Sequence, residues 1–260
     1  MTVDDLAASR GWSDEEARLR SAICEIGKLA YQKGFIVGAD GNISARMADG
    51  TILITPAGAM KGFLSPQHLA HVDLAGKVLD GGPKCSTEVG IHLVAYRERP
   101  EMRAVLHCHP PHAVALTLAG IDMQIPLIPE IIVTIGGIPT APFATPGTDE
   151  LPNSIQAIVR CSDTVVMQNH GSVTLGTNLL DAFKKLDMLE HTAKILWIAS
   201  CVSTPARPPN APPKPVTVPI ARVGNTSAGS VMLPHAAWPN IAIVSRNNAA
   251  VALSTVGNRK

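Results

Sequence analysis

The sequence predicts an α/β domain that is followed by an extension at its C-terminal end. Three observations lead to this prediction. Hydrophobic residues make up 46% of the 260-residue chain and charged residues 17%, a balance typical of a globular protein with a sizeable core. Segments with the apolar spacing of helices alternate with short apolar runs typical of strands. Finally, a segment rich in proline separates this part of the chain from the residues that follow.

The first elements expected along the chain are a helix and a hairpin. Residues 13–33 carry small and apolar side chains three and four positions apart, and Ser13 with the acidic residues behind it provides an N-cap and a favourable first turn. Gly34 ends this helix. Residues 41–46 and 51–55 then read as two short strands around a tight Asp-Gly turn.

A second helix and two buried strands follow. Residues 86–97 place apolar side chains on one helical face, with Ser86 or Thr87 as the cap. Residues 104–109 form a short apolar run closed by two prolines, and residues 164–171 repeat that form. We expect both runs to be strands, and each carries a histidine at its end.

The last helix and the proline-rich segment define the domain boundary. Residues 179–202 carry a long helical pattern that completes the core. Seven of the 21 prolines fall within residues 204–219, which is more than a packed domain accommodates. We therefore expect one catalytic domain over residues 1–203, and a linker with a weakly ordered tail over residues 204–260.

Charge and apolar patterning exclude several classes of function. The chain has 22 Lys and Arg against 21 Asp and Glu, so no global field steers it onto nucleic acid or an anionic membrane. Its apolar runs are far shorter than the ~18 residues of a membrane-spanning helix, and its acidic start does not resemble a secretory signal. Five scattered cysteines favour reduced thiols in the core. We expect a cytoplasmic protein.

Three histidines are candidate metal ligands. His107 and His109 are two residues apart in a predicted strand, so both rings leave the same face and can share one metal ion. Two histidines that bond backbone groups would give the same pattern. His170 ends the second apolar run, and a third histidine would complete the open three-ligand site typical of catalytic zinc.

Other polar residues can serve such a site. Glu88, at the start of the second helix, is either a first-turn acid or a fourth ligand or general base. Residues 41–44 and 55–58 are glycine-bearing turns, which are either ordinary turns or presenters of backbone N–H groups to a phosphate. Lys61 follows closely and adds a positive charge.

Five short motifs occur in a fixed order: Gly41-Asn42-Ile43-Ser44, Thr55-Pro56-Ala57-Gly58, Ser86-Thr87-Glu88, His107-Cys108-His109 and Asn169-His170-Gly171. Together they resemble the motifs of the class II aldolase/adducin family, over residues 15–202. The resemblance implies a three-layer α/β/α sandwich around a mainly antiparallel sheet. It also implies a homotetramer with active sites at subunit boundaries, and a zinc cofactor with manganese or cobalt as alternatives.

The resemblance further implies roles for single residues. Glu88 would be the acid/base, three histidines the zinc ligands and five residues the phosphate site: His107, His109 and His170 for zinc, and Asn42, Thr55, Gly58, Ser86 and Thr87 for phosphate. Glu130 falls where one member of the family carries a tyrosine proton donor. It is expected to be a second catalytic residue, a ligand for another substrate end, or an interface carboxylate.

The expected activity is that of an aldolase. Such a lyase cleaves a ketose 1-phosphate, for example L-fuculose 1-phosphate, to dihydroxyacetone phosphate and an aldehyde through a zinc-stabilised enediolate. The alternatives on the same fold are a decarboxylase of a hydroxy or keto acid and a pentulose-phosphate 4-epimerase, and a substrate without phosphate also stays open. An adducin-like interaction protein is the alternative without catalysis.

Overall fold

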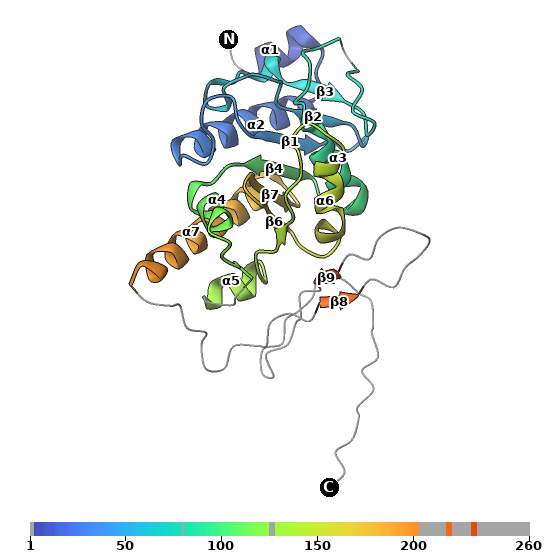
Figure 1. Ribbon diagram of the computed structural model, residues 1–260. Coiled ribbons are helices and arrows are strands. Elements are labelled where there is room, and N and C mark those ends of the chain that lie inside the picture. Colours follow the sequence, from blue (N-terminus) through green and yellow to red (C-terminus); the bar gives the residue numbers. More distant parts are fainter. Residues whose placement is uncertain (1–2, 80, 125–127, 203–216, 220–229, 233–260) are drawn as a thin grey trace.

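A seven-stranded sheet crosses the centre of the molecule (Figure 1). The computed structural model describes residues 3–79, 81–124, 128–202, 217–219 and 230–232. Along the sheet the strands follow the order β3-β2-β1-β4-β7-β6-β5, and every pair is antiparallel except β5 with β6. Their bounds are β1 (Asn42–Arg46), β2 (Ile52–Ile54), β3 (Ala70–Val72), β4 (Ala104–Cys108), β5 (Thr140–Ala141), β6 (Thr164–Met167) and β7 (Gly171–Gly176).

Helices cover both faces of this sheet. One apolar core lies between the sheet and helices α3 and α6, and a second lies between the sheet and helices α2 and α7 (Figure 1). The fold is therefore the expected three-layer α/β/α sandwich with a mainly antiparallel sheet. The helices are α1 (Val3–Arg10), α2 (Asp14–Gln32), α3 (Val89–Glu98), α4 (Pro111–Leu118), α5 (Pro129–Thr134), α6 (Glu150–Val159) and α7 (Leu179–Val202), with short 3-10 helices η1 (Lys61–Phe63) and η2 (Pro66–His68).

Along β1 and β4, in the middle of the sheet, successive side chains point to opposite faces, and polar side chains lie on the face that α3 covers. Leu106 and Cys108 of β4 pack in the core under α2 and α7, so His107 between them points to the opposite face. Asn42 of β1 is the cross-strand partner of His107. Both residues are buried, so two polar side chains lie between the sheet and α3.

The two long helices follow their sequence signals closely. Helix α2 starts after Ser13, whose hydroxyl accepts a hydrogen bond from the backbone N–H of Glu16 at 3.2 Å. The chain leaves α2 through Gly34, at a φ of 72°. Helix α7 spans Leu179–Val202, as expected for the long helical pattern.

The second helix begins later than the sequence predicted. Helix α3 starts at Val89 and has Glu88 as its N-cap, so the prediction of Ser86 or Thr87 as the cap is wrong. The physical reason lies in the Ser86 hydroxyl, which accepts the backbone N–H of Glu88 at 3.2 Å and the side-chain amide of Asn42 at 3.0 Å. These bonds hold the residues before the helix in a turn above β1.

The run over residues 164–171 is two elements rather than one strand. Strand β6 ends at Met167, the chain turns, and β7 starts at Gly171 and runs back antiparallel to β6. Asn169 in this turn has a φ of 58°, a conformation that asparagine adopts more readily than most residues. His170 therefore lies in a turn, not at the end of a strand.

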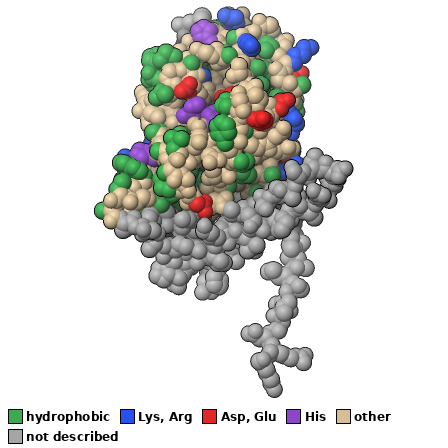
Figure 2. Space-filling model, viewed as in Figure 1, with side chains coloured by type: hydrophobic (Ala, Val, Ile, Leu, Met, Phe, Trp, Pro, Cys, Tyr) green, Lys and Arg blue, Asp and Glu red, His purple; other side chains and the backbone are tan. Residues whose placement is uncertain are grey.

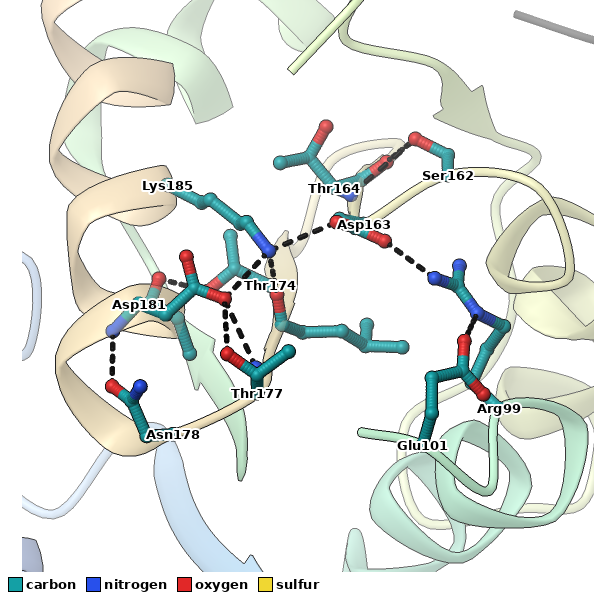
Figure 3. A network of polar contacts seen from close by, with 12 residues as sticks. Arg99, Glu101, Ser162, Asp163, Thr164, Thr174, Thr177, Asn178, Asp181 and Lys185 are labelled. Carbon is teal, nitrogen blue, oxygen red and sulfur yellow. Dashed lines mark hydrogen bonds and ion pairs between the residues drawn. The ribbon is translucent and has the colours of Figure 1, made fainter. Parts of the chain in front are cut away.

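A network of polar side chains ties α7 to the sheet and to the end of α3 (Figure 3). Lys185 Nζ donates to the carbonyl of Leu175 and to Asp163 at 2.9 Å each, and to Asp181 at 3.0 Å. Asp163 also accepts from Arg99 at 2.9 Å. The network stands where β7 runs into α7, at the opposite end of β7 from the β6–β7 turn.

The predicted tail lies outside the described residues, apart from two short strands. Strands β8 (Thr217–Pro219) and β9 (Ser230–Met232) pair antiparallel with one another. Among the residues that the structure describes, no helix has both the length and the apolar character needed to cross a membrane.

Candidate metal centre

Three histidine rings converge where β4 ends. His107 is on β4, His109 is one residue beyond it, and His170 is in the β6–β7 turn. The centroids of the three rings are 4.8 to 5.1 Å apart, and one nitrogen from each ring lies within 4.8 Å of the other two. Nε2 of His107 and Nε2 of His109 are 3.0 Å apart. The structure thus brings together the three residues that the sequence suggested as metal ligands.

A glycine makes this approach possible. A Cβ atom on Gly171 would lie 2.6 Å from the carbonyl oxygen of Cys108 and 2.6 Å from Cδ2 of His109. The same atom would lie 3.0 Å from Cε1 of His107. Because only glycine lacks this atom, the β6–β7 turn can press against the end of β4 and deliver His170 to the other two rings.

Glu88 completes the cluster from the start of α3. Its two carboxylate oxygens lie 3.3 Å from Nε2 of His107 and 3.2 Å from Nε2 of His170. Burial would raise the pKa of Glu88, but the interactions with His107 and His170 outweigh it and hold the pKa well below its usual range. The carboxylate is therefore ionised at neutral pH and faces the histidine nitrogens.

The donor set fits a divalent metal. The Nδ1 of His107 is 3.0 Å from the carbonyl of Ser172 and donates to it, so Nε2 is the nitrogen that faces the cluster. Burial, together with the rings of His107 and His170, lowers the pKa of His109 to about 3, so that this ring is neutral as metal ligands must be. Nδ1 of His170 is buried with no hydrogen-bond partner among the described residues. Three imidazole rings that face one another form a ligand set typical of zinc.

His109, His170 and Glu88 line a cleft of about 430 Å³, and His107 is buried beside them. Histidine side chains gather near the middle of the face shown in Figure 2, with acidic side chains nearby. The polar lining comes from three loops and includes hydroxyl, amide and backbone groups that can bind an anion. Of the predicted phosphate-binding residues, the cleft is lined by Asn42, Gly58, Ser86 and Thr87.

Lys61 places a cation in the same cleft. Its side chain is 2% exposed, and its ammonium group donates to the carbonyl of Ala39. Burial lowers the pKa of Lys61, and the charges of Asp40 and Glu88 oppose that shift. The sequence predicted a positive charge beside the glycine-bearing turn, but not that the side chain of Lys61 is buried.

Two glycines fix the turn that carries Lys61. A Cβ on Gly27 of α2 would lie 2.6 Å from the Lys61 carbonyl oxygen, and a Cβ on Gly62 would lie 2.6 Å from the ring of Tyr31. Helix η1 therefore packs directly on α2. This close packing holds the backbone of Lys61 against the floor of the cleft.

Two predicted site residues lie outside the cleft. Thr55 is buried, and its hydroxyl accepts the backbone N–H of Ile43 at 3.1 Å, which leaves Ala57 as the residue of that turn that lines the cleft beside Gly58. Glu130, in the first turn of α5, is exposed and lines a different cleft of about 470 Å³ together with Lys33. Sequence spacing alone cannot show which predicted residues line the cleft and which lie outside it, because that depends on how distant loops pack.

Residues 21–197 match the family described as Class II Aldolase and Adducin N-terminal domain. The chain belongs to the class II aldolase and adducin family. Two curated members illustrate the range of similar enzymes. A 3-oxo-tetronate 4-phosphate decarboxylase of Pectobacterium atrosepticum is 35% identical over 187 residues, which cover 70% of this chain and 85% of that protein. An L-fuculose phosphate aldolase of Methanocaldococcus jannaschii is 33% identical over 172 residues, covering 66% and 91%.

Solved structures of class II aldolase family members share the fold. YgbL of Escherichia coli superposes with a TM-score of 0.67 at 33% sequence identity and covers 71% of this chain and 90% of its own. The L-fuculose-1-phosphate aldolase of Thermus thermophilus has a TM-score of 0.64 at 30% identity, with coverage of 72% and 96%. The relatives and the solved structures that resemble this chain are enzymes or proposed enzymes, and the histidine cluster is the candidate metal site of the chain.

Proposed function

We propose that this chain is a metal-dependent lyase that removes carbon dioxide from a phosphorylated 3-oxo acid such as 3-oxo-tetronate 4-phosphate. The observation that carries the proposal is the ionised carboxylate of Glu88, which lies within 3.3 Å of two rings of a three-histidine cluster in an open cleft. Similarity to several curated 3-oxo-tetronate 4-phosphate decarboxylases supports it. The ligands would be His107, His109 and His170, and the proposed metal is zinc.

The chain's own residues then have defined tasks. A metal held by the histidines supplies a Lewis acid that polarises the ketone oxygen of the substrate. The bond between the carboxylate and its neighbouring carbon breaks, and its electron pair stays on that carbon as carbon dioxide leaves. Glu88, which is ionised at neutral pH, takes up one proton from an acid in the solvent and delivers it from its carboxyl oxygen to this carbon, so that one proton is consumed for each carbon dioxide released.

Decarboxylation makes smaller demands on this site than aldol cleavage does. In aldol cleavage a second group must take the proton from the hydroxyl whose carbon becomes the aldehyde. Glu130, the expected second group, lines another cleft of the same chain. A carboxylate is already ionised and leaves as carbon dioxide without such a base, so Glu88 alone can serve the reaction.

The lining of the cleft also suits a phosphate group. The residues that line it include Gly58, at a φ of 70°, Ser86, Thr87 and Lys61, together with His109 and His170. Fixed N–H and O–H donors with one cation are the usual surroundings of a bound phosphate. A phosphorylated substrate therefore fits better than a neutral one.

Aldol cleavage of a ketose 1-phosphate is the second candidate. Similarity to L-fuculose phosphate aldolases supports it. If Glu130 enters the active site of a neighbouring subunit in the proposed homotetramer, it would supply the missing proton-transfer group. Epimerisation breaks and remakes a carbon–carbon bond with the same residues and stays a further alternative.

The deciding experiment measures metal and products together. The purified full-length protein is analysed for bound metal and incubated separately with 3-oxo-tetronate 4-phosphate and with L-fuculose 1-phosphate, before and after treatment with a chelator. We expect about one zinc per chain. We also expect carbon dioxide and dihydroxyacetone phosphate in equal amounts from the first substrate, with loss of both after chelation.

The other outcomes identify the alternatives. Dihydroxyacetone phosphate with an aldehyde from L-fuculose 1-phosphate, without turnover of the 3-oxo acid, would replace decarboxylation by aldol cleavage. Inversion of a pentulose phosphate would indicate an epimerase. A protein that binds no metal and turns over none of these substrates would favour the interaction protein without catalysis.

A further inference from the structure

A line of buried polar side chains runs beneath α3 and ends at Glu88. Tyr96 Oη lies 2.8 Å from Ser44 Oγ, and Ser44 Oγ lies 2.6 Å from Nδ1 of His92. The other ring nitrogen of His92 bonds the side-chain oxygen of Asn42. Asn42 in turn donates its amide to a carboxylate oxygen of Glu88 at 3.0 Å. The four residues before Glu88 are at most 1% exposed, so water does not supply alternative partners.

The sequence spacing explains why these residues meet. Glu88, His92 and Tyr96 are four residues apart along α3 and so share one face of the helix, with a rise of about 6 Å between neighbours. Asn42 and Ser44 are two residues apart on β1 and share one face of the sheet, with a rise of about 6.8 Å. These two spacings are nearly equal, so the residues on this face of the helix lie opposite Asn42 and Ser44 of the strand.

The donors and acceptors that each side chain carries determine which atom donates in each hydrogen bond near Glu88. The side-chain nitrogen of Asn42 lies 3.0 Å from a carboxylate oxygen of Glu88 and donates to it, so the NH₂ group of Asn42 points toward Glu88. The same NH₂ group donates to the hydroxyl of Ser86 at 3.0 Å. The carbonyl oxygen of Asn42 is then left to face His92, and it can only accept. Nε2 of His92 must therefore carry a proton.

The hydrogen bonds on the Nδ1 side of the His92 ring are determined in the same way. Burial lowers the pKa of His92 to about 3, with a further contribution from His107, so the ring is neutral at neutral pH. A neutral ring with its proton on Nε2 has a lone pair on Nδ1, which accepts the hydroxyl proton of Ser44. Ser44 Oγ then accepts from the hydroxyl of Tyr96. Each donor in the line has one acceptor and each direction is determined.

We propose that His92, as the neutral tautomer with its proton on Nε2, is a positioning residue that holds the amide of Asn42 in the one orientation that can donate to Glu88. With the opposite tautomer, Asn42 would turn its NH₂ group to His92 and its oxygen to Glu88, where two acceptors would repel one another. His92 thus sets the position of Glu88 without touching the substrate. The kinetic part of the inference rests on the role proposed above for Glu88.

The tautomer can be measured directly in the intact protein. Two-bond ¹H–¹⁵N correlation spectra of the full-length, ¹⁵N-histidine-labelled protein separate the two neutral tautomers and the cation, and the spectrum of the His92→Gln variant identifies the signal. We expect the proton on Nε2 throughout pH 6 to 8. A proton on Nδ1, or a doubly protonated ring in this range, would overturn the proposal whatever reaction the enzyme catalyses.

Variants of His92 test its effect on turnover. His92→Gln retains an N–H donor near the position of Nε2, whereas His92→Leu has none. We expect His92→Leu to lower kcat by roughly 10 to 100-fold, as removal of groups that orient an active site does, with bound metal and KM unchanged. His92→Gln should recover kcat to within about threefold of the original. His71→Leu, which removes a histidine bonded to Thr51 outside the cleft, is the matched control and should leave kcat unchanged.

The outcomes separate this inference from the proposed function. Full kcat in His92→Leu, or an equal loss in His92→Gln and His92→Leu, would overturn the positioning role. If the original protein decarboxylates no 3-oxo acid but cleaves a ketose 1-phosphate, the same comparison is made with that substrate. If His92→Leu does not fold, the tautomer measured in the original protein and the kcat of His92→Gln still decide the question.

Discussion

Single residues in this site hydrogen-bond to several groups at once, so we expect substitutions of these residues to be costly. Asn42 donates to both Ser86 and Glu88 while it accepts from His92. Glu88 faces the nitrogens of His107 and His170. The cleft therefore depends on polar groups whose partners are all inside the protein, where an unmade hydrogen bond costs about 1 to 3 kcal/mol.

Substitutions of single residues can distinguish metal binding from proton transfer. His107→Ala removes a buried ring from the cluster and is expected to abolish both bound metal and turnover. Glu88→Gln keeps the size of the side chain and the three histidines, but the amide cannot move a proton. We expect it to bind metal while kcat falls by about 100-fold or more.

Metal analysis and steady-state kinetics on both variants check this pair of expectations. His71→Ala provides a control histidine that lies outside the cleft. Bound metal in His107→Ala at the original level would remove that residue from the ligand set. Full kcat in Glu88→Gln would show that the proton moves through another group.

At the scale of elements, the close contact between the β6–β7 turn and β4 makes the centre. Gly171→Ala would place a Cβ 2.6 Å from the Cys108 carbonyl oxygen, so the turn must move away and take His170 with it. Such overpacking costs about 1 to 3 kcal/mol, and 1.4 kcal/mol corresponds to tenfold in a binding constant. We expect metal affinity to fall by about tenfold or more.

Competition of the metal-loaded protein with a chelator measures that affinity. Gly137→Ala is a matched control, because no atom lies within 4 Å of a Cβ built there and its φ is not in the left-handed region. Equal metal affinity in Gly171→Ala and Gly137→Ala would show that the turn adjusts without moving His170.

The elements also show what sequence patterns can and cannot predict. Helices α2 and α7 were predictable because long apolar periodicity and a Ser13 cap determine them locally. The start of α3 was not, because the Ser86 hydroxyl is bonded by Asn42, a residue of a distant strand. The short elements α4 and α5, β3 and β5 carry too few residues for a periodic signal, and their formation depends on packing.

The candidate site follows the same rule. The three histidines and Glu88 could be found from motif order, since their residue types and spacing are unusual. The roles of His92 and Lys61 could not, because each becomes visible only when α3 lies on β1 and η1 lies on α2. Thr55 was misplaced for the converse reason, because its hydroxyl is bonded to Ile43 inside the sheet.

At the scale of the whole molecule, the cleft belongs to the part of the chain before the proline-rich segment. The residues that line it fall between Ala39 and His170, and the family match ends at residue 197. Helix α7 leaves large apolar side chains exposed near its end: Ile195 at 37%, Trp197 at 46% and Ile198 at 49%. Such a group favours self-association, in line with the proposed homotetramer.

Deletion of residues 205–260 is therefore expected to leave the oligomer, the bound metal and the activity in place. The remaining chain keeps the whole sheet, α7 and its exposed apolar side chains, so both the cleft and the surface proposed for association are retained. Sedimentation analysis gives the oligomeric mass, and the product assay gives kcat, which should stay within about twofold.

Trp197→Glu in the full-length chain is the informative comparison, because a charge among the exposed apolar side chains of α7 should weaken association while the cleft residues remain. Loss of the oligomer after the deletion would assign the tail a role in assembly, and loss of kcat with an intact oligomer would place part of the tail at the cleft.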